Sequence, residues 1–306
     1  MRRWSNGYDC GLPSRLSGFE TAFLHKAKNL GKCGELLFGR SPRILLRKIK
    51  EAGESPSRRI LINFINHTKF LKIMISIIIP TLNEERHIPK LFRNIKDQNF
   101  GPYEIIVADF NSKDKTRFIA RKNNCKLVEG GLPPKARNNG AKRAKGDLLI
   151  FFDADSLLSK NFFKNSLKEI KERKLNVGSC RIYPISDNLI YKILFAMFNF
   201  WITVTQCCYP NASGSYIFCE RNLHNKISGF NENLKLSEDM DYVKRAGKYG
   251  KFRILRSVKS YTSVRRFKKE GKLNLSLKLL LSSIYRIIFG EIKTDIFRYR
   301  HRHKKH

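Results

Sequence analysis

The sequence is short of acidic residues and of paired cysteines. Its seven cysteines include no CxxC spacing, which argues against both a zinc site and a disulfide framework. We therefore expect a reduced, cytoplasmic location. Only 26 Asp and Glu stand against 61 Lys and Arg, so the formal net charge is +35. Such a surface attracts polyanions, which include nucleic acid, anionic lipid headgroups and diphosphate-bearing substrates.

Residues 1–35 have neither helical nor strand periodicity, and no apolar h-region follows the charged start. A signal peptide is therefore not expected. We expect residues 1–72 to be a basic extension that is either disordered or not part of the native protein. The stretch "SGFET" can be back-translated to contain GGTTCGAA, the T-loop sequence of a transfer RNA gene, which favours Met74 as the natural start. Amino-terminal sequencing of the native protein tests this.

From Met74 onward, buried strands alternate with amphipathic helices. The strands are expected at "MISIIIP", "YEIIVAD", "CKLVEG" and "DLLIFFDAD", and the helices at "NEERHIPKLFRNIKDQ", "KDKTRFIARKNN" and "PPKARNNGAKRAKG". This alternation predicts an α/β fold with a Rossmann-like, mostly parallel sheet flanked by helices. Ligands bind such sheets at the carboxyl ends of the strands.

Three of the predicted strands end in polar side chains. These are Thr81, Asn83 and Glu84, then Asp109 and Asn111, then Asp153 and Asp155. Each set alone is typical of an ordinary turn, and "DAD" by itself would favour one. Because the three ends meet at one edge of the sheet, together they predict a binding site.

Four segments, in this order and spacing, resemble the family 2 glycosyltransferases of the GT-A fold, which are nucleotide-diphospho-sugar transferases. They are "SIIIPTLNEE", "EIIVADFNSKDKT", "KARNNGAKRAKGDLLIFFDADS" and "SGFNENLKLSEDMDYVKRAGKYGKF". The resemblance covers roughly residues 74–270. It implies a GT-A domain over residues 73–262, followed by a basic segment with C-terminal amphipathic helices over residues 263–306. The implied reaction moves a sugar from a nucleotide-diphosphate sugar to an acceptor hydroxyl or phosphate.

The resemblance makes Asp153-Ala154-Asp155 the DXD motif. Asp155 would bind Mg²⁺ or Mn²⁺, which holds the diphosphate oxygens and acts as a Lewis acid on the leaving group. Asp153 would face the ribose or a metal-bound water, because alternate residues at a strand end point to opposite sides.

In the family, the aspartate of an "ED" pair is the general base on the acceptor hydroxyl. That role would fall to Asp239, which implies inversion at the anomeric carbon, while Glu238 would orient the acceptor or the local loop. The alternative is that Ser237, Glu238 and Asp239 cap the helix that follows them. Both interpretations can hold together.

By resemblance, nucleotide recognition falls to the first two strand ends. Pro80, Thr81, Asn83 and Glu84 would line the base and ribose, and Asp109 would bond the pyrimidine edge. The alternative for residues 83–85 is a helix cap. The usual "DDGS" is replaced here by "DFNS", which leaves the nucleotide open. Lys135 and Arg137 would clasp the diphosphate, the alternative being a solvated helix face.

Residues 189–210 are apolar for about seventeen positions, fewer than the roughly twenty that cross a bilayer. They predict a core helix or an interfacial helix, and the Phe and Trp content favours the interface. Gly214 and Ser215 resemble an acceptor-side turn of close approach, and Arg265 and Arg266 a phosphate-contacting pair. Together these features predict an enzyme peripherally associated with the cytoplasmic membrane, with a lipid-linked acceptor on an anionic membrane surface.

Three other functions fit parts of the sequence. The narrower one is a polyprenyl-phosphate glycosyltransferase. A basic nucleic-acid-binding protein without catalysis would suit the charge, but the basic residues are spread along the chain rather than gathered in a reader module. A nucleotidyltransferase would need a Gly-rich loop after the first strand, and "PTLNEERH" has no glycine.

Overall fold

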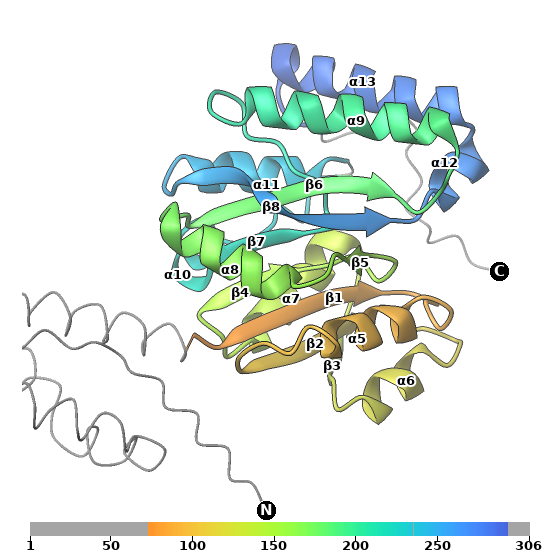
Figure 1. Cartoon of the computed structure of the whole chain (residues 1–306), viewed down its shortest axis with the longest axis vertical. Coiled ribbons are helices and arrows are strands. Elements are labelled where there is room, and N and C mark those ends of the chain that lie inside the picture. The colour runs from red at the N-terminus through yellow and green to blue at the C-terminus, as the bar shows by residue number, and fades with distance from the viewer. Residues whose placement is uncertain (1–72, 235, 293–306) are drawn as a thin grey trace, which may run out of the picture. The chain divides into compact units, whose positions relative to one another are not determined.

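An eight-stranded sheet runs through the part of the chain that the computed structural model describes, residues 73–234 and 236–292 (Figure 1). The expected basic extension and the "RYRHRHKKH" tail lie outside these residues. The strands are β1 (Ile75–Thr81), β2 (Tyr103–Asp109), β3 (Lys126–Glu129), β4 (Leu148–Phe151), β5 (Leu157–Leu158), β6 (Val177–Pro184), β7 (Ile217–Glu220) and β8 (Phe252–Thr262). The helices are α5 (Ile88–Lys96), α6 (Thr116–Lys122), α7 (Pro133–Arg143), α8 (Phe162–Glu172), α9 (Leu189–Thr205), α10 (Arg221–Lys226), α11 (Glu238–Gly247), α12 (Arg265–Glu270) and α13 (Lys272–Phe289).

The strand order is β3-β2-β1-β4-β7-β6-β8-β5. Strands β3, β2, β1 and β4 are parallel to one another, and β6 and β8 are also a parallel pair. Strand β7 pairs antiparallel with β4 and β6, and β5 pairs antiparallel with β8. The prediction of a mostly parallel sheet flanked by helices is therefore confirmed. The division of the chain at residues 262 and 263 stays a prediction.

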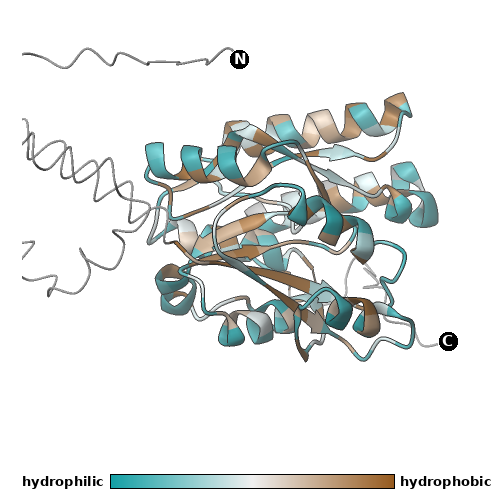
Figure 2. Cartoon of the chain, turned by 60° about the horizontal axis from the view of Figure 1, so that its bottom comes forward, coloured by the Kyte–Doolittle hydropathy of each residue, from teal (hydrophilic) through white to brown (hydrophobic). Residues whose placement is uncertain are grey.

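The sheet is covered on both faces, as its apolar strands require. One core combines Ile75, Ile77 and Ile79 of β1 with side chains of α5, α6 and α8. The other core combines Ile78 with side chains of α7, α10 and α11. In Figure 2 the central strands are largely brown, while teal residues gather on the outer helices.

Helix α7 packs closely on β1, and a glycine permits this. A Cβ on Gly140 would lie 2.4 Å from Cγ2 of Ile78, so a larger residue would push the helix off the sheet. Pro133 and Pro134 open α7, where proline is tolerated because the first amides of a helix have no intrahelical acceptor. This packing fixes the place of Arg137 one turn into the helix.

The strand β4 ends earlier than predicted, at Phe151. Asp153 and Asp155 therefore lie in the turn after the strand, closed by a hydrogen bond from the Ser156 amide to the Asp153 carbonyl of 3.1 Å. The argument that the two side chains alternate along a strand was wrong. The turn nevertheless directs them to different partners, as the next section describes.

Helix α9 buries only a narrow stripe, made of Tyr191, Phe195, Asn199 and Ile202. Asn199 bonds both the amide and the carbonyl of Ile182, so α9 lies along the edge of β6 beyond the reach of β7. The other side of α9 is apolar and exposed. Within residues 73–234 and 236–292, no helix combines the length and the hydropathy that a membrane crossing needs.

Candidate active site

Arg137 lies at the centre of a buried group of carboxylates. Its Nη1 donates to Oε1 of Glu238 over 2.9 Å, and its Nη2 donates to Oδ1 of Asp153 over 3.0 Å. The arginine side chain is only 3% exposed, and its guanidinium carbon lies 5.3 Å from the centre of the Phe230 ring. Burial acts to lower the pKa of Arg137, but the surrounding carboxylates outweigh it and raise that pKa overall. The cation is permanent, and it ties α7 and α11 to the turn after β4.

Asp239 completes this cluster from the first turn of α11. Its Oδ2 accepts a hydrogen bond of 2.7 Å from the Gly214 amide, and its Oδ1 accepts one of 2.9 Å from the Met240 amide. Burial and the nearby Glu238 carboxylate raise the pKa of Asp239 to about 7, although Arg137 acts to lower it. A carboxylate with this pKa can accept a proton near neutral pH.

Ser237 does not cap α11 with its side chain, as the alternative interpretation of this segment required. It has a left-handed backbone, with φ 62°, and its side chain makes no capping hydrogen bond in the described structure. The helix instead begins with three acids in its first turn, Glu238, Asp239 and Asp241, which the positive end of the helix dipole favours. The acids therefore support the helix start, and the hydroxyl does not.

A second arginine, Arg265, binds the other carboxylates of the sheet edge. Its Nε lies 2.9 Å from Oδ2 of Asp155, and its Nη1 and Nη2 donate to the two oxygens of Glu84 over 2.9 and 2.7 Å. His87 joins the group, with Nδ1 2.9 Å from Oε2 of Glu84. Burial raises the pKa of Asp155 to about 6, against the opposing effect of Arg265.

The ends of β1 and β2 are locked together by Asp109. Its carboxylate accepts hydrogen bonds from the Thr81 hydroxyl (3.0 Å), the Ser112 hydroxyl (2.6 Å) and the Ser112 amide (2.9 Å). Asn111 has a left-handed backbone, with φ 54°. Asparagine adopts this conformation more readily than most residues, which explains how "DFNS" keeps a turn where the family pattern has glycine.

The remaining predicted residues lie at the same edge of the sheet but outside the two arginine clusters just described. Pro80 is partly buried near the end of β1, and Asn83 is exposed, with its side chain accepting from the Lys113 amide over 2.8 Å. Lys135 and Arg266 are exposed on α7 and α12. Ser215 is buried, and its carbonyl accepts from the Ser156 hydroxyl over 3.2 Å, which joins the Gly214 turn to the turn after β4.

The carboxylates suit a hard divalent cation. Among the described residues, no group of three or more His, Cys, Asp or Glu side chains could hold a metal by itself. Magnesium sites with one or two protein carboxylates are completed by substrate phosphates and water. Asp155 fits that chemistry, with Arg265 as its present counter-charge.

The sequence motifs did not predict the pairing of Glu84 with Arg265 or the contact of His87 with Glu84. The expected roles of Glu84 beside the ribose and of Arg265 beside a phosphate stay predictions. These residues are 181 positions apart, so no local pattern could link them. Phe230 under Arg137 was also missed, for the same reason.

The family model for glycosyl transferase family 2 matches residues 76–232. The chain is 28% identical over 130 residues to the poly(ribitol-phosphate) beta-N-acetylglucosaminyltransferase TarS of Staphylococcus aureus. The matched region is 39% of this chain and 23% of that protein. It is 32% identical over 142 residues to the dolichyl N-acetyl-alpha-D-glucosaminyl phosphate 3-beta-D-2,3-diacetamido-2,3-dideoxy-beta-D-glucuronosyltransferase of Methanococcus voltae, over 40% of this chain and 44% of that protein. The chain thus spans less than half the length of either relative.

Two solved structures share the fold. A crystal structure of S. aureus TarS residues 1–349 matches with a TM-score of 0.52 and 23% identity, over 70% of this chain and 66% of that one. The mannosyltransferase PcManGT of Pyrobaculum calidifontis, in complex with GDP-Man and Mn²⁺, matches with a TM-score of 0.57 and 19% identity, over 74% of this chain and 70% of that one.

Proposed function

The chain belongs to glycosyl transferase family 2, and we propose that it transfers a sugar, with inversion, from a nucleotide-diphosphate sugar to a hydroxyl of a lipid-linked acceptor at an anionic membrane surface. The observation that carries this proposal is the convergence of Asp153, Asp155 and Asp239 at one edge of the sheet, where Arg137 binds Asp153 and Glu238 and Arg265 binds Asp155. This edge is where ligands of open α/β sheets bind.

The proposed chemistry assigns each carboxylate a separate task. Asp239 accepts the proton of the acceptor hydroxyl as the oxygen attacks the anomeric carbon, and the bond from that carbon to the diphosphate oxygen breaks on the opposite face. Asp155 would hold Mg²⁺ or Mn²⁺, and the bound cation would supply positive charge for the departing diphosphate. Glu238 holds Arg137 in place, and Arg137 fixes Asp153 beside the donor.

The donor's nucleotide would lie over the ends of β1 and β2. Pro80, Thr81, Asn83 and Glu84 border this surface, and Asp109 keeps it rigid by its three hydrogen bonds. Lys135 stands exposed at the start of α7, where it can meet a phosphate. A relative of the same fold is crystallised with GDP-Man and Mn²⁺, which supports a nucleotide sugar and a divalent cation for this chain.

The lipid-linked acceptor is supported by the exposed apolar side of α9. Its exposed side chains include Leu189 (67%), Met197 (64%) and Phe200 (71%). Helices α9 and α13 lie at the same end of the described body in Figure 1, and Lys272 of α13 lies 5.1 Å from the centre of the Tyr191 ring of α9. Apolar side chains bordered by cations are typical of helices that lie in a membrane interface with anionic lipid.

The names of two relatives point to the same acceptor class. The M. voltae protein is named for a dolichyl-linked sugar phosphate, and a Campylobacter jejuni relative, 29% identical over 120 residues, is named as a GalNAc(5)-diNAcBac-PP-undecaprenol beta-1,3-glucosyltransferase. Both names describe a saccharide on a polyprenyl carrier. We propose an acceptor of this kind for the present chain.

Donor turnover tests the catalytic proposal. The full chain is incubated with UDP-GlcNAc, UDP-glucose and GDP-mannose, with and without Mn²⁺, and release of the nucleotide diphosphate is measured. We expect turnover of at least one donor with the cation, and its loss in Asp155→Ala. Asp97→Ala, which replaces an exposed aspartate at the C-terminal end of α5, is the matched control and should keep full activity. If no donor turned over, or if Asp155→Ala retained full turnover, the proposal would be wrong.

Liposome flotation tests the membrane surface. The full chain should float with phosphatidylglycerol liposomes at low salt, and Phe200→Glu should float less. Phe118→Glu on α6 is the matched control, since Phe118 is comparably exposed (65%) but lies away from α9. Equal flotation of the two variants would contradict an α9 interface.

A further inference from the structure

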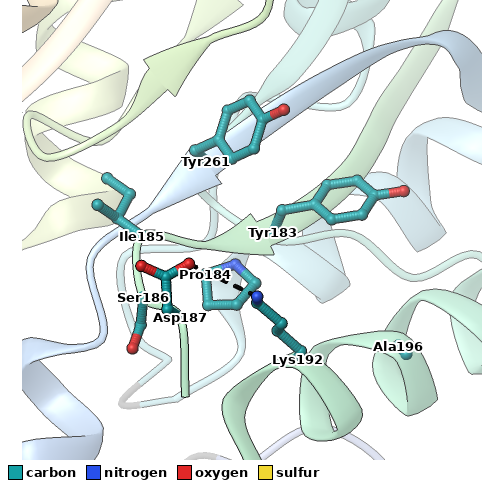
Figure 3. A pocket seen from close by; sticks show the side chains of 8 residues that line it. All are labelled: Tyr183, Pro184, Ile185, Ser186, Asp187, Lys192, Ala196 and Tyr261. Atoms are coloured by element: carbon teal, nitrogen blue, oxygen red, sulfur yellow. Dashed lines mark ion pairs between the residues drawn. The ribbon is translucent and has the colours of Figure 1, made fainter. Parts of the chain in front are cut away.

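A cavity of about 560 Å³ opens where β6, β8 and the start of α9 meet. Its lining includes the rings of Tyr183 and Tyr261, the ion pair of Asp187 and Lys192, and the hydroxyl of Ser186 (Figure 3). In Figure 3, Lys192 reaches from α9 toward Asp187, below the two tyrosine rings. None of these side chains has a role in the chemistry proposed above.

The cavity lies at the same edge of the sheet as the active site. Strands β4 and β6 both pair antiparallel with β7, and β8 is parallel to β6, so the carboxyl ends of β4, β6 and β8 point the same way. Tyr261 pairs with Leu157, two residues beyond Asp155, and Arg265 follows Tyr261 by four residues. The cavity is therefore a direct neighbour of the Arg265 cluster.

On its other side the cavity joins the apolar surface of α9. Lys192 and Ala196 line the cavity, and the adjacent residues Ile193 and Met197 belong to the exposed apolar side, at 49% and 64%. A ligand in this cavity would thus lie between the catalytic edge and the surface proposed to meet the membrane. A saccharide attached to a membrane lipid would occupy that position.

The lining itself suits a saccharide. The two tyrosine rings have centroids 5.9 Å apart and an interplanar angle of 44°, and Lys259 Nζ lies 5.1 Å from the centre of the Tyr183 ring. Sugars present C–H faces that pack on aromatic rings and hydroxyls that bond charged side chains. Mainly apolar walls with a few placed polar groups are also the common composition of ligand pockets.

We propose that this cavity is a saccharide subsite, which binds a sugar unit of the acceptor other than the one that carries the reacting hydroxyl. The proposal rests on the proposed function, in that the acceptor is a lipid-linked glycan. Tyr183 and Tyr261 supply the packing surface, and Asp187 and Lys192 bond the hydroxyls. The subsite selects the acceptor by its inner sugar and holds it beside the membrane.

Saturation-transfer NMR on the full chain tests the subsite without any donor. The probes are the methyl glycosides of glucose, N-acetylglucosamine and mannose. At least one should receive saturation from the wild-type chain, and Tyr183→Ala and Tyr261→Ala should weaken its binding roughly tenfold each, as the loss of an aromatic contact implies. Tyr249→Ala is the matched control, because Tyr249 is also a surface tyrosine with a lysine ammonium over its ring, 4.5 Å from Lys226 Nζ.

The outcomes separate this proposal from the proposed function. Absence of binding by the wild-type chain, or equal binding by the tyrosine variants, overturns the subsite even if a donor is turned over. Binding that requires both rings, in a chain that turns over no donor, supports the subsite and overturns the proposed function. If a tyrosine variant fails to fold, Asp187→Ala keeps the test decisive: it should weaken binding several-fold, and unchanged binding would overturn the subsite.

Discussion

Removing the charge of Arg137 should destabilise the protein far more than removing any exposed cation. In Arg137→Met, the carboxylates of Asp153, Glu238 and Asp239 lose the cation that they share. Breaking a buried ion pair from one side typically costs about 3–5 kcal/mol, because an uncompensated charge stays buried. Since domains are stable by only about 5–15 kcal/mol, this loss is a large part of the total.

Urea unfolding at pH 7.5, followed by far-UV circular dichroism, measures the loss. Lys168→Met is the matched control: it removes an exposed cation, which lies 3.9 Å from Glu172 with both side chains more than half exposed. Surface pairs of this kind contribute about 0–1 kcal/mol. We expect the Arg137 variant to lose at least 2 kcal/mol more than the control.

The pH dependence makes this prediction specific. Arg137 acts to lower the pKa of Asp239, so its removal should raise that pKa further above about 7. The folded variant then holds a proton that the unfolded chain releases, and its stability rises as the pH falls toward 5. The deficit of Arg137→Met should therefore shrink at pH 5. An equal deficit at pH 5 and 7.5, or one no larger than that of Lys168→Met, would refute the buried-charge argument.

The remaining predictions concern Asp239 and Arg265. Asp239→Asn should lower the transfer rate by roughly 10²–10⁴-fold, while donor binding measured by calorimetry stays unchanged. The wild-type kcat/KM should fall below about pH 7, where the base becomes protonated, and a flat profile would exclude Asp239 as the base. Because the folded protein holds the Asp239 proton up to about pH 7, the wild type loses stability as the pH rises above the ordinary aspartate pKa. Asp239→Asn should therefore have a higher free energy of unfolding in urea than wild type at pH 8, by at most about 4 kcal/mol, and no such advantage at pH 3. Arg265→Ala should bind Mn²⁺ several-fold more tightly in calorimetry, because Asp155 no longer pairs with the arginine and is free to bind the cation. Lys268→Ala on the same helix is the control. Equal affinities of the two variants would contradict the idea that Arg265 and the cation compete for Asp155.

The sheet was predictable because its strands are continuous apolar runs. The prediction located β2 to the residue and placed β1 one residue too early, because strands buried on both faces read as unbroken apolar runs. Strand β4 was extended too far, because Phe152 continues the apolar run although the ladder has ended. A buried aromatic after a strand looks the same in sequence as one within it.

Helix α9 shows where periodicity stops being informative. Its seventeen residues are apolar on nearly every side, so periodicity alone did not separate a core helix from an interfacial one, and only the Phe and Trp content favoured the interface. In the structure Asn199, a polar residue within this run, bonds the amide and the carbonyl of Ile182 on β6. Because that one contact sets the rotation of the helix, Phe200 and Met197 face outward.

The charged residues were the least predictable part of the site, and the reason is distance along the chain. Arg137 meets Glu238 across 101 positions, and Arg265 meets Glu84 across 181. Neither arginine differs locally from its basic neighbours Lys135 and Arg266, which are exposed. Arg137 and Arg265 differ from these neighbours because each forms an ion pair with a carboxylate from a distant part of the chain. A guanidinium that would be solvated on an isolated helix is therefore held in place at the site. Because the chain has a formal charge of +35 and few acidic residues, the positions of those acids determine which basic side chains form the buried ion pairs of the site.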